Sequence, residues 1–467
     1  MSQQISSPQD HPLATRKISK LIAKFAIPSI ISFLVSALYN IVDQIFIGQG
    51  VGMLGNAATN VAFPLTTIAT SLALLFGIGG AANFNLSMGR GDQVRAGYMA
   101  GNAVSLLGIF GLCLGAITLI FLHPLMAIFG ATEQVMPYAL TYTSITAFGL
   151  PFLIFSTGCS HLIRADGSPT YSMACMLSGA ILNTILDPLF IFTFEMGIAG
   201  GALATVIGQV LSATMAFFYF FRFKSVSLTL ATLRPRLSHA KSIASLGAAP
   251  CFNQLAMTAV QIALNNTLTY YGALSSYGSE IPLACVGVIS KVNVLLMAFI
   301  IGICQGCQPI FSFNYGAQNY ARVKKTYLTA VRIIMIISVL AFLCFQIFPR
   351  PIVSIFGSGS EEYFHFAERY FRIYMLMTFI NGIQPLTSNF FTAIGKAKKG
   401  ILMSLTRQII FLLPLILLFP LFFGIDGVMY AGPIADTAAA ILAVAFILRE
   451  FRQMNVPQHP TEGVSEV

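Results

Sequence analysis

Apolar stretches of about 20 residues recur along the whole chain, and this feature limits the possible folds more than any other. As an α-helix, a stretch of that length crosses a hydrocarbon core of roughly 30 Å. Hydrophobic residues make up 56% of the 467 residues and charged residues only 9%, against about 25% charged residues in ordinary soluble domains. The sequence therefore predicts an all-α integral membrane protein with twelve transmembrane helices, at 21–47, 55–82, 98–122, 135–161, 170–195, 200–223, 245–274, 281–308, 325–348, 364–392, 399–422 and 427–450.

The distribution of basic residues predicts the orientation of these helices. The net charge is +10, but the basic residues form small groups at helix ends and no continuous stripe, which argues against a nucleic-acid partner. By the positive-inside rule, both termini lie in the cytoplasm and the protein is multi-pass in the inner (plasma) membrane. The residues assigned to the cytoplasmic side are Arg16, Lys17, Lys20, Lys24, Arg90, Arg95, Arg164, Arg222 to Lys241, Arg322, Lys324, Lys325, Lys396, Lys398, Lys399, Arg449 and Arg452.

The chain also repeats itself with an offset of 227 residues. HPLMAIFG at 123–130 matches RPIVSIFG at 350–357, and GIAGG at 197–201 matches GIDGV at 424–428. Six crossings return the chain to its starting side, so the repeat predicts two six-helix bundles related by a pseudo-two-fold axis along the membrane normal, with a ligand cavity between them. The predicted organisation is a cytoplasmic tail at 1–20, bundles at 21–223 and 242–451, a cytoplasmic linker at 224–241 and a second tail at 452–467.

Three acids, Asp43, Asp187 and Asp436, fall well inside predicted helices. An ionised carboxylate at the centre of a spanning helix costs roughly 2.5 to 3.5 kcal/mol on insertion scales, so intramembrane acids usually face a cavity and act on ions, protons or substrates. At 1.5 Å per residue, Asp43 lies about 28 Å beyond Lys24, and Asp187 lies roughly 26 Å beyond Thr170. Both helices run outward, so the two carboxylates are expected at one depth, in the outer part of the membrane.

Other oxygen-bearing side chains are expected at the same depth. Asn183 shares a helix face with Asp187 because they are four residues apart, while Thr205 and Tyr142 lie near the outer ends of their helices. Such an oxygen-rich group suits Na⁺ or a shared proton. The sequence predicts an ion-coupling site of Asp43, Asn183, Asp187, Thr205 and Tyr142. Because the repeat offset replaces Asp43, Asp187 and Thr205 by Tyr270, Pro414 and Gly432, the site is expected in the first bundle alone.

A central cavity is expected to be lined by further polar residues, because solvated polar groups are improbable elsewhere in a membrane. Asp436 has two interpretations that the sequence leaves open: it faces this cavity, or it has a structural role, as the partner of Arg407 or in a hydrogen bond between helices. The CQGC pair Cys304 and Cys307 is expected to be packed as small apolar side chains, since neither a second CxxC nor a nearby His accompanies it. The residues assigned to the cavity are Tyr39, Asn40, Gln209, Gln261, Asn265, Lys291 and Asp436.

From about residue 18 to 452, the sequence resembles the multidrug and toxic compound extrusion (MATE) transporters, in particular the archaeal and Gram-positive efflux subgroup. The matching segments are Pro28 with YNIVDQIFIG at 39–48, NTILDPLFIF at 183–192, GIAGGALAT at 197–205 and GICQGCQPIFSFNYGAQNYARV at 302–323.

The resemblance implies a role for several of these residues. In that subgroup, the cation or proton site is attributed to the positions of Asp43, Asn183, Asp187 and Thr205, with the tyrosine at Tyr142 close by. Pro28 matches the proline at which the first helix bends on protonation, so it is a candidate hinge. Other bacterial members place essential acids in helices 7 and 10. Here helix 7 has only amides, and Glu368 in helix 10 lies near the outer end, so a second cation site is not expected.

Taken together, these features predict a secondary active multidrug efflux transporter of amphipathic, mostly cationic compounds, working by alternating access in antiport with H⁺ or Na⁺. No cofactor, and no metal beyond a coupling Na⁺, is expected, and the protein is expected to be a monomer in the lipid bilayer. The alternative is a flippase for a lipid-linked precursor, which needs a cavity rich in Lys and Arg. An enzyme is not expected, because His123 and His161 have no nucleophile at their depth.

Overall fold

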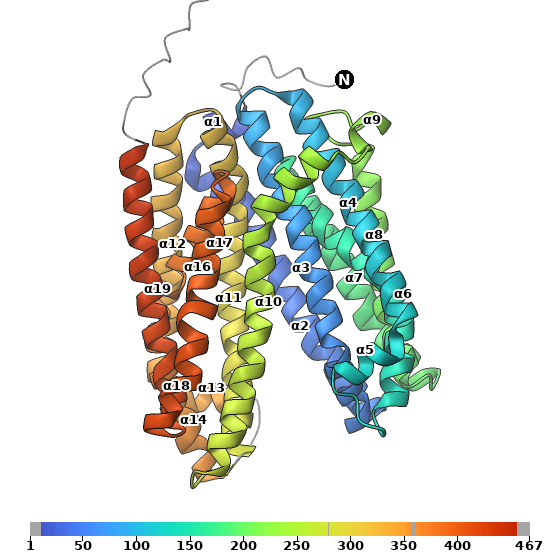
Figure 1. The fold of residues 1–467 in the computed structure, drawn as a ribbon, viewed down its shortest axis with the longest axis vertical. Helices are drawn as coiled ribbons and strands as arrows, with labels where there is room; N and C mark the ends of the chain where they lie inside the picture. Colours follow the sequence, from blue (N-terminus) through green and yellow to red (C-terminus); the bar gives the residue numbers. More distant parts are fainter. Residues whose placement is uncertain (1–10, 279, 356–359, 455–467) are drawn as a thin grey trace, which may run out of the picture.

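The computed structural model describes residues 11–278, 280–355 and 360–454, and all regular secondary structure in these ranges is helical (Figure 1). Half of the first predicted tail, at 1–10, and most of the second, at 455–467, lie outside them. The elements are α1 Pro12–Thr15, α2 Ile18–Gly50, α3 Met53–Gly89, α4 Gln93–Ile120, α5 Leu122–Ile128, α6 Met136–Ala165, α7 Pro169–Pro188, the π-helix η2 Leu189–Thr193, α8 Ile198–Phe220, α9 Leu230–Leu233, α10 Leu237–Ala273, α11 Glu280–Gly316, α12 Tyr320–Ile347, α13 Pro349–Ser354, α14 Glu361–Tyr374, α15 Thr378–Asn381, α16 Ile383–Ala393, α17 Ala397–Leu405, the π-helix η3 Thr406–Leu412, α18 Leu413–Phe423 and α19 Asp426–Gln453.

Eleven of the twelve predicted crossings are helical segments long and apolar enough to span a membrane. The twelfth, predicted as one helix at 364–392, is divided into α14, α15 and α16. Glycine weakens a helix interior by about 1 kcal/mol relative to alanine, and Gly382 stands at the junction of α15 and α16. Charged side chains crowd α14, where Glu368, Arg369 and Arg372 follow one another closely. We count α14 to α16 together as the twelfth crossing.

The offset of 227 residues relates whole helices. Added to the bounds of α3 and α4, it gives the bounds of α11 and α12. The short helices α5 and α13, which were not predicted, are also related by it. Even the caps correspond: Asp92 accepts a hydrogen bond from the Arg95 N–H at the start of α4, and Asn319 accepts one from the Arg322 N–H at the start of α12. The two halves of the chain therefore have matching helix bounds and helix caps at these positions.

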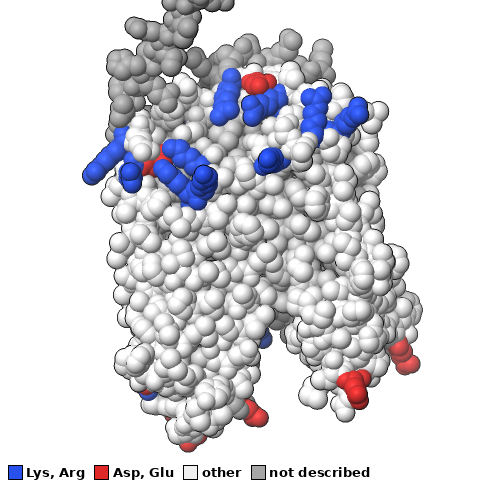
Figure 2. All heavy atoms as spheres, in the orientation of Figure 1, with Lys and Arg blue, Asp and Glu red and all other residues white. Residues whose placement is uncertain are grey.

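Helices α2 to α8 form one bundle and α10 to α19 the other (Figure 1). The bundles are joined mainly by α3 on α10 and by α2 on α11. At one level the backbones touch, because a Cβ added to Gly247 in α10 would lie 1.7 Å from the Leu75 carbonyl oxygen in α3. Toward the opposite end the bundles separate, and the surface is hollowed between two lobes (Figure 2).

Charged side chains mark the two ends of the molecule differently. On the face shown in Figure 2, most Lys and Arg gather at the end where the bundles meet, while most Asp and Glu lie on the two separate lobes. The long surface between the ends carries almost no charge. This arrangement suits a protein whose middle lies in lipid and whose basic end faces the cytoplasm.

Candidate functional site

Asn183, Asp187 and Thr205 are brought together by the close packing of α7 on α8. Gly179 and Gly208 face each other across this contact, where a Cβ added to Gly208 would lie 2.6 Å from the Gly179 carbonyl oxygen. The two backbones can approach this closely only because neither residue has a side chain. As a result, Asn183 Nδ2 donates hydrogen bonds to Asp187 Oδ1 and to Thr205 Oγ1, both at 3.3 Å.

Asp43 completes this group from α2. Its carboxyl group and that of Asp187 lie within hydrogen-bonding reach of each other, as the depth argument from the sequence requires. Asp187 is fully buried and Asp43 is 8% exposed. Asp43 lines the cavity described below, and Asp187 lies behind it.

Three oxygen atoms in this acid cluster, which we define as Asp43, Asn183, Asp187 and Thr205, are buried and accept no hydrogen bond from any residue that the structure describes. They are Asp43 Oδ1, Asn183 Oδ1 and Asp187 Oδ2. Buried acceptors without donors are costly, and two neighbouring carboxylates are costlier still. One proton shared between the carboxyl groups, or one hard cation ligated by the three oxygens, removes this cost. The cluster is therefore chemically suited to hold H⁺ or Na⁺.

Two tyrosines lie close to the acid cluster. Tyr39 precedes Asp43 by about one turn of α2, and Tyr142 reaches the same region from α6. Both line the cavity next to Asp43. Asp187 is not a lining residue, so a compound in the cavity contacts Asp43 and the tyrosines and not Asp187.

Pro188 marks the C-terminal end of α7, as its position in the sequence suggests. The α-helix ends at Pro188 and continues as the π-helix η2, in which the Phe194 N–H donates to the Leu189 carbonyl at 3.0 Å. Proline has no N–H to donate to the carbonyl of Thr184, one turn earlier. The predicted helix at 170–195 is thus interrupted beside Asp187, at a place where α-helical hydrogen bonding is already weakened.

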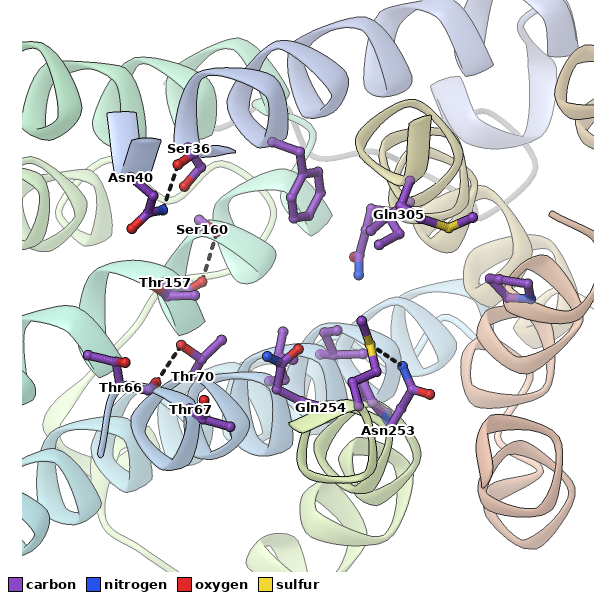
Figure 3. Close-up of a pocket in the computed structure, with 18 of the residues that line it drawn as sticks. Ser36, Asn40, Thr66, Thr67, Thr70, Thr157, Ser160, Asn253, Gln254 and Gln305 are labelled. Carbon is purple, nitrogen blue, oxygen red and sulfur yellow. Dashed lines mark hydrogen bonds between the residues drawn. The ribbon is translucent and has the colours of Figure 1, made fainter. Parts of the chain in front are cut away.

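A cavity of about 550 Å³ lies between the bundles and is lined by residues of both. Most of its polar groups are neutral, and Figure 3 shows a threonine row from α3, the amides Asn253 and Gln254 from α10, and Gln305 from α11 around one open space. The hydroxyl groups in this row largely bond to their own helix, as Thr70 does to the Thr66 carbonyl at 2.8 Å. Neutral threonine and amide side chains of this kind make only weak polar contacts with a ligand, so they select little for its shape.

Residues 28–189 and 251–448 match the family model described as MatE. This chain belongs to the MatE family. The match covers both bundles, so it agrees with the repeat and with the two-bundle fold.

Relatives of this MatE chain are named as multidrug export proteins. It is 26% identical over 438 residues to the multidrug export protein MepA of Staphylococcus aureus strain MSSA476, which covers 93% of this chain and 94% of MepA. It is equally similar to the MepA protein of Staphylococcus haemolyticus strain JCSC1435, with the same coverage.

Solved structures show the same fold. One is described as the outward-facing conformation of a multidrug resistance MATE family transporter, with a TM-score of 0.88 at 23% identity, covering 95% of this chain and 98% of the other. Another, from Pyrococcus furiosus Vc1, is a MOP superfamily transporter for which a reverse polarity of the binding pocket is said to suggest a different function. It has a TM-score of 0.88, 23% identity and the same coverage.

The predicted cavity residues of this MatE chain fall into two groups. Tyr39, Asn40 and Gln209 line the cavity. Gln261 and Asn265 do not, although by helical periodicity they continue the face of α10 that carries the lining amides. Both are exposed further along α10, and Gln261 Nε2 donates to Asn265 Oδ1 at 2.9 Å.

Two other predicted cavity residues lie elsewhere. Lys291 is exposed on α11, about 110° around the helix from the centre of the face that lines the cavity, and it is not a lining residue. Asp436 is also not a lining residue, because Arg407 stands between it and the open space: Arg407 Nε donates to Asp436 Oδ1 at 2.5 Å. Of the two interpretations that the sequence left open for Asp436, the structure supports the ion pair.

Arg164 is expected from the sequence among the basic residues of the cytoplasmic side, and the structure adds that it is buried. It is only 3% exposed and lines the cavity together with His161. It lies in the last turn of α6, and counting residues cannot distinguish a side chain that points outward from one that points inward. A basic residue directly before the tight ADGSP turn gave no signal of burial.

The candidate hinge and the cysteine pair are both buried. Helix α2 runs through Pro28 as one helix, and the adjoining turns pack against α11, where Cβ atoms added to Gly302 and Gly306 would meet Ile30 and Ala26. Cys304 and Cys307 are 3% and 0% exposed, as expected for packed apolar side chains, and Cys304 also lines the cavity. The bending role of Pro28 stays a prediction.

Proposed function

We propose that this protein is a secondary active multidrug efflux transporter that exports amphipathic, mostly cationic compounds in antiport with H⁺ or Na⁺ by alternating access. The observation that carries the proposal is the acid cluster, whose three unsatisfied buried oxygens adjoin a cavity shared by both bundles. The export names of the relatives and the family membership support the drug substrates.

We propose that ion binding and compound binding are coupled through Asp43, which lies between the ion site and the compound in the cavity. Asp43 faces the cavity while its partner Asp187 is buried, so a cationic compound near Asp43 and an ion in the cluster compete for the same negative charge. Binding of the ion from outside then favours release of the compound to the outside. The protein with the ion bound then returns to the state in which the cavity opens to the cytoplasm. The second bundle is proposed to take no part in ion binding, since Tyr270, at the position matching Asp43, is exposed.

The orientation of the cycle follows from the surface charge. We propose that the basic end, where the bundles meet, faces the cytoplasm with both termini, and that the hollow between the lobes opens to the outside. The protein is proposed to act as a monomer in the inner membrane.

A flippase for a lipid-linked precursor is the second candidate, and the cavity does not favour it. Anionic phosphate groups need several Lys or Arg contacts. Among the described lining residues, Arg164 and Arg407 are the cationic ones, and Arg407 is already paired with Asp436.

Efflux from proteoliposomes tests the proposed function and identifies the coupling ion. The protein is reconstituted with the fluorescent cation rhodamine 6G, and an inward proton gradient and an inward sodium gradient are imposed in separate experiments. We expect one of the two gradients to accelerate export of the dye severalfold over vesicles at equilibrium. Export that is insensitive to both gradients would contradict ion-coupled antiport, and liposomes without protein give the background leak.

A further inference from the structure

The end of the cavity formed by Arg164 differs in charge from the end formed by the acid cluster. Tyr142, beside the acid cluster, and Arg164 belong to the same helix and are 22 residues apart, which corresponds to about 33 Å along the axis. A drug-sized compound cannot contact both. The cavity therefore has an acidic outer end and a basic inner end.

Arg164 has almost none of the partners that a buried guanidinium needs. Its one hydrogen bond in the described structure runs from Nη1 to Gln305 Oε1 at 3.4 Å, although a guanidinium has five N–H donors. No described carboxylate lies within 4.0 Å of it. Asp166, two residues away, is fully engaged by the Tyr219 hydroxyl and by the backbone N–H groups of Lys224 and Ser225.

Two further polar side chains, neither of them acidic, lie beside Arg164. His161, one turn earlier on α6, is 5% exposed, and its Nδ1 has no partner among the described residues. Gln305 is 6% exposed, and its amide points into the open space beside Ser160 and Thr157 (Figure 3). An anion at this position would accept hydrogen bonds from the guanidinium and from the Gln305 amide.

The second arginine of the cavity is a useful contrast. Arg407 is held by Asp436, so its charge is balanced inside the protein. Leaving a buried charge without a partner is strongly destabilising, and a protein keeps such a charge where a ligand supplies the partner. Arg164 is in that situation and Arg407 is not.

We infer that Arg164, with Gln305 and His161, forms an anion-binding subsite at the inner end of the cavity, and that it receives the carboxylate of transported amphipathic compounds. Compounds that carry both a carboxylate and a cationic group are therefore substrates, together with simple cations. The carboxylate lies against Arg164, and the remainder of the compound extends among the neutral amides and threonines. This inference rests on the proposed function and names part of its substrate class.

A matched pair of dyes tests the subsite. Rhodamine 19 carries a free carboxylate, and rhodamine 6G is its ethyl ester, so the two share one cationic ring system. Equilibrium binding to the purified protein is followed by fluorescence anisotropy without any ion gradient. Hydrogen bonds between charged groups are about twice as strong as those between neutral groups, so we expect Arg164→Gln to weaken binding of rhodamine 19 at least roughly tenfold. Binding of rhodamine 6G should change less than about twofold, and Arg164→Lys should recover part of the lost affinity.

The other outcomes contradict the subsite. Equal losses for both dyes would mean that Arg164 only supports the fold, and unchanged binding of both would mean that its charge meets no ligand. If Arg164→Gln does not fold, the wild type still decides, because binding of rhodamine 19 tenfold weaker than rhodamine 6G would exclude an anion site. Since no gradient is used, a failure here is separate from a failure of ion-coupled efflux.

Discussion

Replacement of Asp187 by Asn is expected to abolish gradient-driven export of rhodamine 6G while leaving the protein folded in the membrane. Asparagine keeps the oxygen that accepts from Asn183 Nδ2, so the contact between α7 and α8 is preserved. It removes the negative charge that the acid cluster needs for a proton or Na⁺. Dye efflux from proteoliposomes, driven by whichever gradient the wild type uses, measures the effect.

Asp92→Asn is the matched control for this substitution. Asp92 caps α4, and its counterpart in the second half is Asn319, which makes the same cap. Asparagine caps a helix as well as aspartate does, so Asp92→Asn should transport like the wild type. Gradient-driven efflux by Asp187→Asn at the wild-type rate would contradict the role assigned to the acid cluster.

Asp436→Asn is expected to cost the protein about 3 to 5 kcal/mol of stability, because it leaves Arg407 buried without its counter-charge. The side chains of this pair are 13% and 4% exposed. Unfolding in detergent, followed as a function of added denaturing detergent, measures the loss. The double variant Arg407→Gln with Asp436→Asn should recover much of it, since no unpaired charge remains.

The exposed pair Arg350 and Glu361 provides the comparison. These side chains are 49% and 78% exposed, and exposed ion pairs are worth about 0 to 1 kcal/mol. Glu361→Gln should therefore hardly change unfolding. If Asp436→Asn lowered the stability as little as Glu361→Gln, the Arg407–Asp436 pair would be open to water. The conclusion that Arg407 is not free to bind a ligand would then be wrong.

The acid cluster could be predicted from the sequence because each step was local. Four-residue spacing placed Asn183 and Asp187 on one face, and the rise of a helix placed Asp43 at the same depth. The repeat could be predicted for a similar reason, since an offset of 227 residues is visible in short motifs and then extends to the bounds of α11 and α12.

The same reasoning cannot predict contacts between helices that are far apart in the sequence. The burial of Arg164 could not be predicted, because nothing near it in sequence shows that α6 turns this side chain toward Gln305, 141 residues later. Asp436 had two equally good interpretations until the position of Arg407 was known. The touching backbones of α3 and α10 depend on Gly247, and many other glycines in the chain make no such contact.

Ion release on drug binding is the most direct test of the central claim, that the acid cluster is where the coupling ion binds. Rhodamine 6G is added to purified protein in weak buffer with a pH indicator, and in parallel to protein equilibrated with ²²Na⁺. The account predicts that the wild type releases about one proton or one sodium ion per dye bound, and that Asp43→Asn and Asp187→Asn release none. Equal release by the wild type and both variants would contradict it.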